Sequence, residues 1–493
     1  MNKNCMFLNI FSLFLIQIIL TIYNFLIPKM ILFYYNSEVN GFILSLNQFL
    51  NYINIIEGGV SSVILAILYK PIAINDIDEV SAIIKATNRI FRKIGYILFI
   101  YTIILAVIYP YFITVRYNRV YIFAMTMVIS FSIFVQYCFS LSYKLLLQAK
   151  KKSYIYSFSQ AVSLGIILII SSYLLKRGED LLLVKLVAGI IFFLHAFLFM
   201  KYTKKMCNIK EVKKENKNFI AKRWDGFGIN IASFVHNNTD IVLISFFLNL
   251  KEVSVYSVYN LIILGIKMFI STISIGFTPL LGEYYAKKEF NKLNLIFDKY
   301  EQIILFVSFA IGTITTKTII PFITLFTKNT TDVNYIRPSF GIIFIIYAVI
   351  FSIREPFINM SYVTGQFKTI TKYAYIEASI NIIMSLFLIV KFELNGVILA
   401  TLFSTLYRTM IQIIFLENKI LKRNYKNLLI KIIVFILLMC SNLYLAKFIN
   451  STIDDWIDWI IYSFKITIIV ILVQSLYMLF YYRKFILGKG VKK

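Results

Sequence analysis

The chain has 493 residues, of which 59% are hydrophobic and only 15% charged, and its mean hydropathy is +0.77. So much apolar surface excludes an ordinary soluble protein of this size and predicts a multi-pass membrane protein. The formal net charge of +27 does not indicate nucleic-acid binding, because the basic residues lie in short loops between apolar segments, as membrane topology requires.

Apolar stretches of about 20 residues predict fourteen membrane-spanning helices and therefore an all-α fold. Their approximate limits are 8–33, 40–68, 91–113, 119–142, 153–175, 181–201, 227–250, 254–281, 298–321, 338–361, 368–390, 395–417, 428–449 and 457–481. The first stretch has no small-residue cleavage site and, at roughly 30 residues, is too long for a signal peptide. We therefore expect it to be a retained span.

Lysine and arginine collect in the loops that follow the even-numbered spans. The loop after the sixth span carries nine basic residues between positions 201 and 223, whereas the odd-numbered loops hold scattered cations such as Arg116 and Lys176. Because cytoplasmic loops are enriched in basic residues, this distribution predicts that both termini are cytoplasmic.

The longest polar stretch divides the chain into two halves. We predict an N-terminal six-helix lobe over 1–202, a basic cytoplasmic linker over 203–222, a C-terminal six-helix lobe over 223–427, and two extra helices with a basic tail over 428–493. A faint repeat relates Gln148 to Gln366 and Lys70 to Glu283, at offsets of 218 and 213 residues. Since six is an even number, both copies enter the membrane from the same side, as in a parallel repeat.

Amides and hydroxyls recur every three or four residues along the first, second, seventh and eighth spans, which places them on one face of each helix. These stripes are Gln17, Thr21, Asn24 and Pro28; Asn47, Asn51, Asn54 and Gly58; Asn230, Ser233, Asn237 and Asp240; and Asn260, Lys267, Ser271, Ser274 and Thr278. In hydrocarbon such faces are costly unless they meet protein or a water-filled cavity. Several inward polar faces predict a hydrophilic path, and hence a transporter.

Ionisable residues inside the spans are candidate site residues, because each costs at least about 2.5–3.5 kcal/mol at mid-helix. The predicted substrate-binding residues, suited to an anionic substrate, are Lys29, Lys267, Arg354, Arg408, Asn51, Asn237 and Asn260. The predicted carriers of a driving proton or cation are Glu57, Asp240 and Glu355.

A structural role is the alternative for these charged groups. Internal salt bridges would fix helix register, and Arg354 and Glu355 directly precede Pro356, which suits a local structural role equally well. Lys29 alternatively extends its amine to the outer interface. His236 lies beside a polar stripe and fits a hydrogen-bonded core group better than a proton relay.

Catalytic and metal chemistry find no support in the residue pattern. The four cysteines are scattered, without a CxxC pair or a Cys/His cluster, and the two histidines, His195 and His236, are far apart. No nucleophile and base stand together, and no Walker motif indicates direct ATP coupling. We predict a transporter with no cofactor and no metal site, driven by an H+ or Na+ gradient.

Several short motifs carry a family resemblance. They are Asn40-Gly41-Phe42, Gln48-Phe49-Leu50, Glu57-Gly58-Gly59-Val60, Leu68-Tyr69-Lys70-Pro71, Asn238-Thr239-Asp240-Ile241 and Pro279-Leu280-Leu281-Gly282-Glu283. In these motifs and in its six-plus-six-plus-two layout the chain resembles the Wzx-type flippases of lipid-linked oligosaccharides. These belong to the polysaccharide transporter branch of the multidrug/oligosaccharidyl-lipid/polysaccharide exporter superfamily.

The resemblance implies a protein of the bacterial inner (cytoplasmic) membrane. It would move undecaprenyl-pyrophosphate-linked oligosaccharide repeat units of O-antigen, capsule or exopolysaccharide across the membrane by alternating access. The implied partners are this lipid-linked glycan, membrane lipids, and a polymerase and chain-length regulator of the same pathway, with no nucleic acid.

Two other functions compete with this interpretation. A multidrug or cation antiporter of the same superfamily would share the fold but prefer an acidic cavity, whereas Lys267 and Arg408 favour an anionic cargo. A membrane polysaccharide polymerase usually carries a long outer loop with clustered arginine or histidine, and here no outer loop exceeds about 20 residues.

Overall fold

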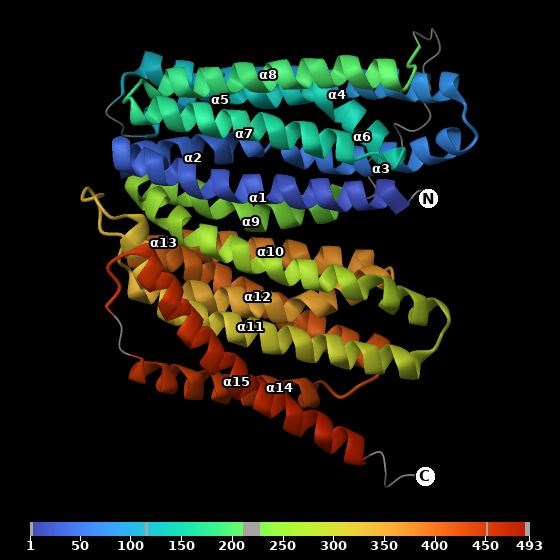
Figure 1. Cartoon of the computed structure of the whole chain (residues 1–493), viewed down its shortest axis with the longest axis vertical. Coiled ribbons are helices and arrows are strands. Elements are labelled where there is room, and N and C mark those ends of the chain that lie inside the picture. The colour runs from blue at the N-terminus through green and yellow to red at the C-terminus, as the bar shows by residue number, and fades with distance from the viewer. Residues whose placement is uncertain (1–2, 114–116, 211–226, 450–451, 489–493) are drawn as a thin grey trace. The chain divides into compact units, whose positions relative to one another are not determined.

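A computed structural model of the chain describes residues 3–113, 117–210, 227–449 and 452–488, and these are helical and contain no strand (Figure 1). The α-helices are α1 (Lys3–Tyr34), α2 (Ser37–Asn51), α3 (Asn54–Ala73), α4 (Ile77–Ile108), α5 (Arg119–Val135), α6 (Leu141–Ala149), α7 (Tyr154–Lys176), α8 (Leu181–Met206), α9 (Phe227–Phe247), α10 (Leu250–Ala286), α11 (Phe290–Phe326), α12 (Pro338–Val363), α13 (Phe367–Leu416), α14 (Tyr425–Leu445) and α15 (Trp456–Gly488). The short elements are η1 (Tyr109–Tyr111), η2 (Gln136–Ser140), η4 (Glu417–Leu421) and η5 (Ala446–Phe448). The predicted all-α class is confirmed.

The number of spans agrees with the hydropathy pattern. Eleven helices in the described part of the chain are long and apolar enough to cross a membrane. The three other expected spans correspond to α2 with α3, to α9, and to the second half of α13. The chain is therefore a multi-pass membrane protein.

Short polar residues begin several helices by accepting the free backbone N–H groups of the first turn. The side chain of Asn36 accepts from the Val39 N–H at 2.9 Å ahead of α2, and Asp76 accepts from the Glu79 N–H at 2.8 Å ahead of α4. In α4 the acidic Asp78 and Glu79 also lie in the first turn, where they complement the helix dipole.

The second expected span, 40–68, is not one continuous helix. Two helices, α2 and α3, occupy this region. The backbone tightens between α2 and α3, where the Tyr52 and Ile53 amides donate three residues back to Phe49 and Leu50. A turn of this kind has 3.0 rather than 3.6 residues per turn. Asn51 and Asn54 therefore do not follow one continuous helical period across the junction.

The expected boundary between the eleventh and twelfth spans is a sharp kink within α13. Glu393 has a φ of 49°, and the two halves of α13 turn back closely around it. A Cβ on Gly396 would lie 2.2 Å from the Leu388 carbonyl oxygen, so only glycine fits at this turn.

The helices form two compact units, each described here by itself. Unit 1 comprises Met1–Phe234 and Ile244–Ser254, and in it α7 packs on α1 and α8 while α5 packs on α4 and α8. Unit 2 comprises Val235–Leu243 and Val255–Lys493, and in it α12 packs between α11 and α13 while α14 and α15 pack on α11. Of the predicted linker 203–222, residues 211–222 lie outside the described residues, as do Arg116 and the end of the basic tail.

The internal repeat is visible in the helix boundaries. Residue numbers 37 and 250, where α2 and α10 begin, differ by 213. The starts of α4 and α11, 77 and 290, differ by the same number, as do those of α7 and α13, 154 and 367. The duplication predicted from Lys70 and Glu283 therefore extends through both six-helix sets.

Close backbone approach explains the Asn40-Gly41-Phe42 motif. A Cβ on Gly41 would lie 1.7 Å from the Leu250 carbonyl oxygen, at the start of α10. Beside it the Asn40 amide donates to the Ser254 hydroxyl at 2.7 Å, and both side chains are buried. The motif thus joins α2 to the first turn of α10 inside unit 1.

We predict that Gly41→Ala lowers the thermal unfolding temperature of the purified protein, because the added methyl group forces backbone apart at a cost of about 1–3 kcal/mol. Gly265→Ala is the matched control, since nothing lies within 4 Å of a Cβ at that position. Equal unfolding temperatures for Gly41→Ala and the wild type would show that the two helices do not meet as described.

Candidate functional site

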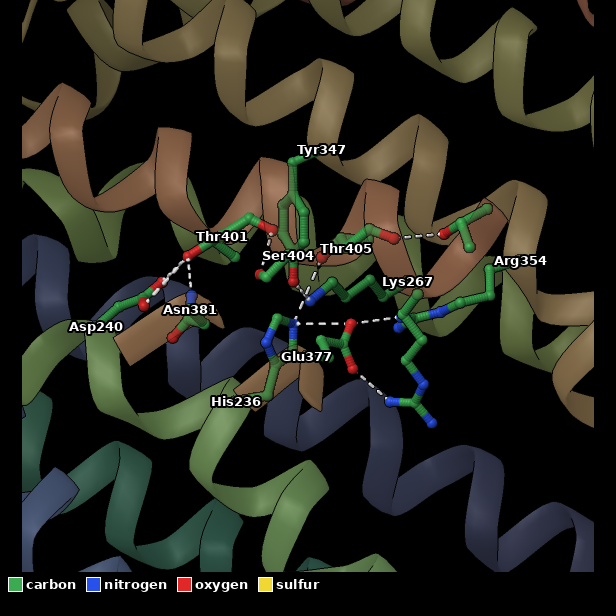
Figure 2. A network of polar contacts seen from close by, with 12 residues as sticks. His236, Asp240, Lys267, Tyr347, Arg354, Glu377, Asn381, Thr401, Ser404 and Thr405 are labelled. Carbon is green, nitrogen blue, oxygen red and sulfur yellow. Dashed lines mark hydrogen bonds and ion pairs between the residues drawn. The ribbon is translucent and has the colours of Figure 1, made fainter. Parts of the chain in front are cut away.

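The core of the candidate site is a carboxylate held by two arginines inside unit 2 (Figure 2). Glu377, on the first half of α13, is 0% exposed. Its two oxygens accept from Arg354 of α12 and Arg408 of the second half of α13, each at 2.5 Å. A carboxylate paired with two guanidinium groups is satisfied electrostatically, so these charges can be buried together.

His236 completes this group from α9. Its Nε2 lies 3.6 Å from Glu377 and 3.5 Å from the Thr405 hydroxyl. The Nε atoms of Arg354 and Arg408 are buried and have no hydrogen-bond partner among the described residues. Each guanidinium therefore keeps a donor that Glu377 does not use.

A second carboxylate, Asp240 of α9, has neutral partners. Tyr256 donates to Asp240 Oδ2 at 2.9 Å, and the Thr401 hydroxyl lies 3.0 Å from the same oxygen. Asn381 donates its amide to Thr401 at 2.9 Å, and its own carbonyl oxygen is buried without a partner in the described part of the chain. Thr401 also lies 3.1 Å from the Val397 carbonyl oxygen.

The atoms around Asp240 are hard oxygen ligands. They come from a carboxylate, a hydroxyl, an amide carbonyl and a backbone carbonyl next to the kink of α13. Such oxygens suit a proton or a hard cation and do not suit a soft metal. The unused Asn381 oxygen is the strongest sign that this group can accept a cation.

Lys267 of α10 lies between the two carboxylate groups (Figure 2). Its ammonium donates to the Tyr347 hydroxyl at 2.5 Å and lies 4.4 Å from the centre of the Phe351 ring. Both Asp240 and Glu377 attract it electrostatically. The aromatic contacts give the ammonium a defined position without neutralising it.

The network carries excess positive charge. Lys267, Arg354 and Arg408 supply three cations, and Asp240 and Glu377 supply two carboxylates. With His236 neutral, one positive charge remains among these five residues; the half-buried Glu355, which attracts Arg354 from outside the network, is not counted. An arrangement of this kind can hold an anion beside Lys267 while Asp240 exchanges a proton or cation.

The structure places four predicted site residues in this network and six elsewhere. Asp240, Lys267, Arg354 and Arg408 come together, although the two arginines are already paired with Glu377. Asn237 is exposed on α9, and Asn260 and Glu355 are half-buried on α10 and α12. Lys29, Asn51 and Glu57 belong to unit 1, where Glu57 accepts from the Tyr137 hydroxyl at 3.0 Å.

The polar stripes meet different surroundings along their length. Thr21 and Asn24 are exposed on α1, whereas Ser274 is buried on α10 and donates to the Ile270 carbonyl. The side chains of Asn230 and Ser233 lie outside the described residues. A common cavity lined by all four polar stripes remains a prediction.

Glu377 is the important residue that the sequence analysis missed. It lies within the predicted span 368–390, where a carboxylate needs an explanation. A signal was present, since Glu377, Asn381 and Ser385 are four residues apart and all three are 0% exposed. Tyr347 was missed as well, because nothing in its apolar surroundings distinguishes it from other tyrosines.

Residues 227–387 match the MatE family model. This segment covers about a third of the chain and includes Asp240, Lys267, Arg354 and Glu377. No curated protein sequence matches the chain.

Solved structures share the fold. The lipid II flippase MurJ in an inward closed conformation superposes with a TM-score of 0.74 at 15% identity, over 98% of this chain and 100% of that one. An inward-facing multidrug resistance MATE family transporter gives 0.65 at 11% identity, over 80% and 93%. A mutant of the Vibrio cholerae MATE transporter VcmN gives 0.59 at 12% identity, over 85% and 98%.

The fold is therefore that of the MATE and MurJ transporters. The match to the MatE family model lies within this shared fold, over α9 to the first half of α13.

We predict that Glu377→Gln lowers the unfolding temperature strongly, because breaking a buried ion pair costs about 3–5 kcal/mol and here leaves two arginines without their counter-charge. The double variant Glu377→Gln with Arg408→Gln should recover part of the loss. The control is Glu283→Gln, whose carboxylate pairs with Lys287 and is 52% exposed. If Glu377→Gln unfolds at the temperature of that control, the pairing is not structural.

Proposed function

We propose that the chain is an ion-coupled flippase for undecaprenyl-pyrophosphate-linked oligosaccharide units of O-antigen, capsule or exopolysaccharide. It would work in the bacterial inner membrane, with both termini cytoplasmic. The observation that carries the proposal is the excess positive charge of the buried network, with Lys267 held by aromatic groups and not neutralised by its own carboxylate. Pyrophosphate is the anionic part of such a substrate, and ammonium and guanidinium groups recognise phosphate oxygens.

The fold comparisons support a flippase over a multidrug antiporter. The MurJ structure covers 98% of this chain, whereas the two MATE structures cover 80% and 85%. The difference is comparable in size to the part of the chain that follows α13. A cation antiporter would also gain little from a site whose charged residues sum to a positive value.

Asp240 is proposed as the residue that carries the coupling ion. Its carboxylate, the Thr401 hydroxyl and the unpartnered Asn381 oxygen are suited to Na+, and a proton is the alternative. Lys267 is attracted by both Asp240 and Glu377, so a change of charge at Asp240 alters the field at the ammonium. This provides a direct electrostatic link between ion and anionic substrate.

We predict that Lys267→Ala abolishes surface polysaccharide in a strain that depends on this gene, while the protein still reaches the membrane. Lys267→Arg should keep part of the activity because it keeps the charge. Lys372→Ala, which removes an exposed lysine from α13, is the control. The measurement is surface glycan together with the leaflet position of the lipid-linked precursor. Normal glycan in Lys267→Ala would contradict the assignment.

We expect NaCl, compared with choline chloride, to raise the unfolding temperature of the wild type by a few degrees, because an ion that binds only the folded state stabilises it. Asp240→Asn and Thr401→Val should both remove this shift. If Thr401→Val keeps gradient-driven flipping and no sodium effect is seen, the coupling ion is a proton. Sodium stabilisation that survives in Asp240→Asn would place the cation elsewhere.

A further inference from the structure

A basic cavity lies in unit 1, away from the network described above. It has a volume of about 830 Å³ and is formed by residues 81–96 of α4, by α6, and by the end of α8 with the residues that follow it. Its lining includes six cations and no acid: Lys85, Arg89, Arg92, Lys93, Lys204 and Lys210. The volume is in the range of small-molecule sites.

The equivalent position in unit 2 carries acidic residues instead of basic ones. At the offset of 213 residues, Lys85, Asn88 and Lys204 correspond to Asp298, Glu301 and Glu417. The correspondence is structural as well. The Lys210 amide donates to Ser81 at 3.1 Å, and Asn294, the counterpart of Ser81, donates to the Leu421 carbonyl at 3.1 Å. In both units, the segment after the last repeat helix is bound to the same helix start.

In unit 2 this place is closed by internal ion pairs. Arg423 contacts Glu417 and lies 2.8 Å from Glu301, and Lys431 of α14 lies 2.6 Å from both Asp298 and Glu301. Burial lowers the pKa of Arg423, but hydrogen bonds and attraction from Glu417 and Glu301 outweigh it and raise that pKa. The negative charges on the repeat helices are thus neutralised by basic residues of the same chain.

In unit 1 the charges on the helices are reversed. Among the described residues, Arg92, Lys93 and Lys204 have no carboxylate partner, and Lys210 is paired with Asp78 at 3.3 Å. An anion bound in the cavity could neutralise Arg92, Lys93 and Lys204, as the chain's own charges do in unit 2. Asn88 and Tyr143, joined at 3.2 Å, add hydrogen-bonding groups to the same wall.

The surroundings indicate where the anion comes from. Tyr96 lines the cavity and is 63% exposed, and it begins a stretch of α4 whose apolar side chains Ile97 and Ile100 are 51% and 59% exposed. In a membrane-spanning helix such side chains face lipid tails. If α4 crosses the membrane as its length and hydropathy predict, the cavity lies near the level of the lipid headgroups.

We propose that this cavity binds the phosphate of a phosphorylated lipid headgroup. The guanidinium of Arg92 and the ammonium groups of Lys93 and Lys204 would contact the phosphate oxygens, and the lipid tails would lie along the exposed face of α4 beyond Tyr96. The proposal does not depend on the transported substrate, because none of these residues belongs to the network in unit 2.

The test is a titration of the full chain in detergent with phosphatidic acid and with phosphatidylcholine, followed by native mass spectrometry. We expect the wild type to prefer phosphatidic acid, and Arg92→Gln with Lys204→Gln to lose at least about tenfold in affinity, since two charge-assisted contacts disappear. Both side chains are exposed, so the fold should survive, as an unchanged unfolding temperature would show.

The matched control is Lys299→Gln with Lys419→Gln, which removes two exposed lysines from α11 and η4 of unit 2 and should bind like the wild type. Equal binding of the two lipids, or unchanged affinity in the cavity variant, would overturn the proposal. Inorganic pyrophosphate separates the two sources of phosphate. Competition with phosphatidic acid supports a shared phosphate site, whereas binding of pyrophosphate without binding of the lipid would overturn the lipid assignment.

Discussion

The pairing of Glu377 with Arg354 and Arg408 is the interaction on which the C-terminal unit depends. It joins α12 to both halves of α13 across the kink at Glu393, and all three side chains are buried. Removing Glu377 leaves two buried guanidinium groups without their counter-charge, so this one carboxylate constrains the helices that carry both arginines.

The repeat shows how one helical frame acquires two different chemistries. Glu377 and Arg408 correspond, at 213 residues, to Leu164 and His195 on α7 and α8. His195 makes a contact of 3.1 Å with the Ser159 hydroxyl, and no charge is needed there. The two repeats have helix ends at equivalent positions because turns and packing set these ends. Their buried charges differ because each unit has to neutralise only the charges that it contains.

The same comparison distinguishes charges that pair with one another from charges that neutral groups hold in place. Where Asp298, Glu301 and Glu417 meet Arg423 and Lys431, opposite charges satisfy one another and hold α14 against α11. At Lys267 the cation is held by aromatic groups, and at Asp240 the carboxylate is held by neutral donors. Charges that are positioned without being neutralised are the ones free to respond to a ligand or an ion.

The membrane class, the spans and the repeat can be predicted from the amino-acid sequence alone, because hydropathy, loop charge and helix length are local properties of the chain. The sequence also identified Lys267, Asp240, Arg354 and Arg408, since a charge in an apolar span is visible without a structure. The folded chain was needed to show that both arginines share Glu377 and that Lys267 contacts Tyr347. These contacts join residues that are 23 to 80 positions apart in the sequence. Local periodicity shows which face of a helix is polar, but it does not show which other helix that face contacts.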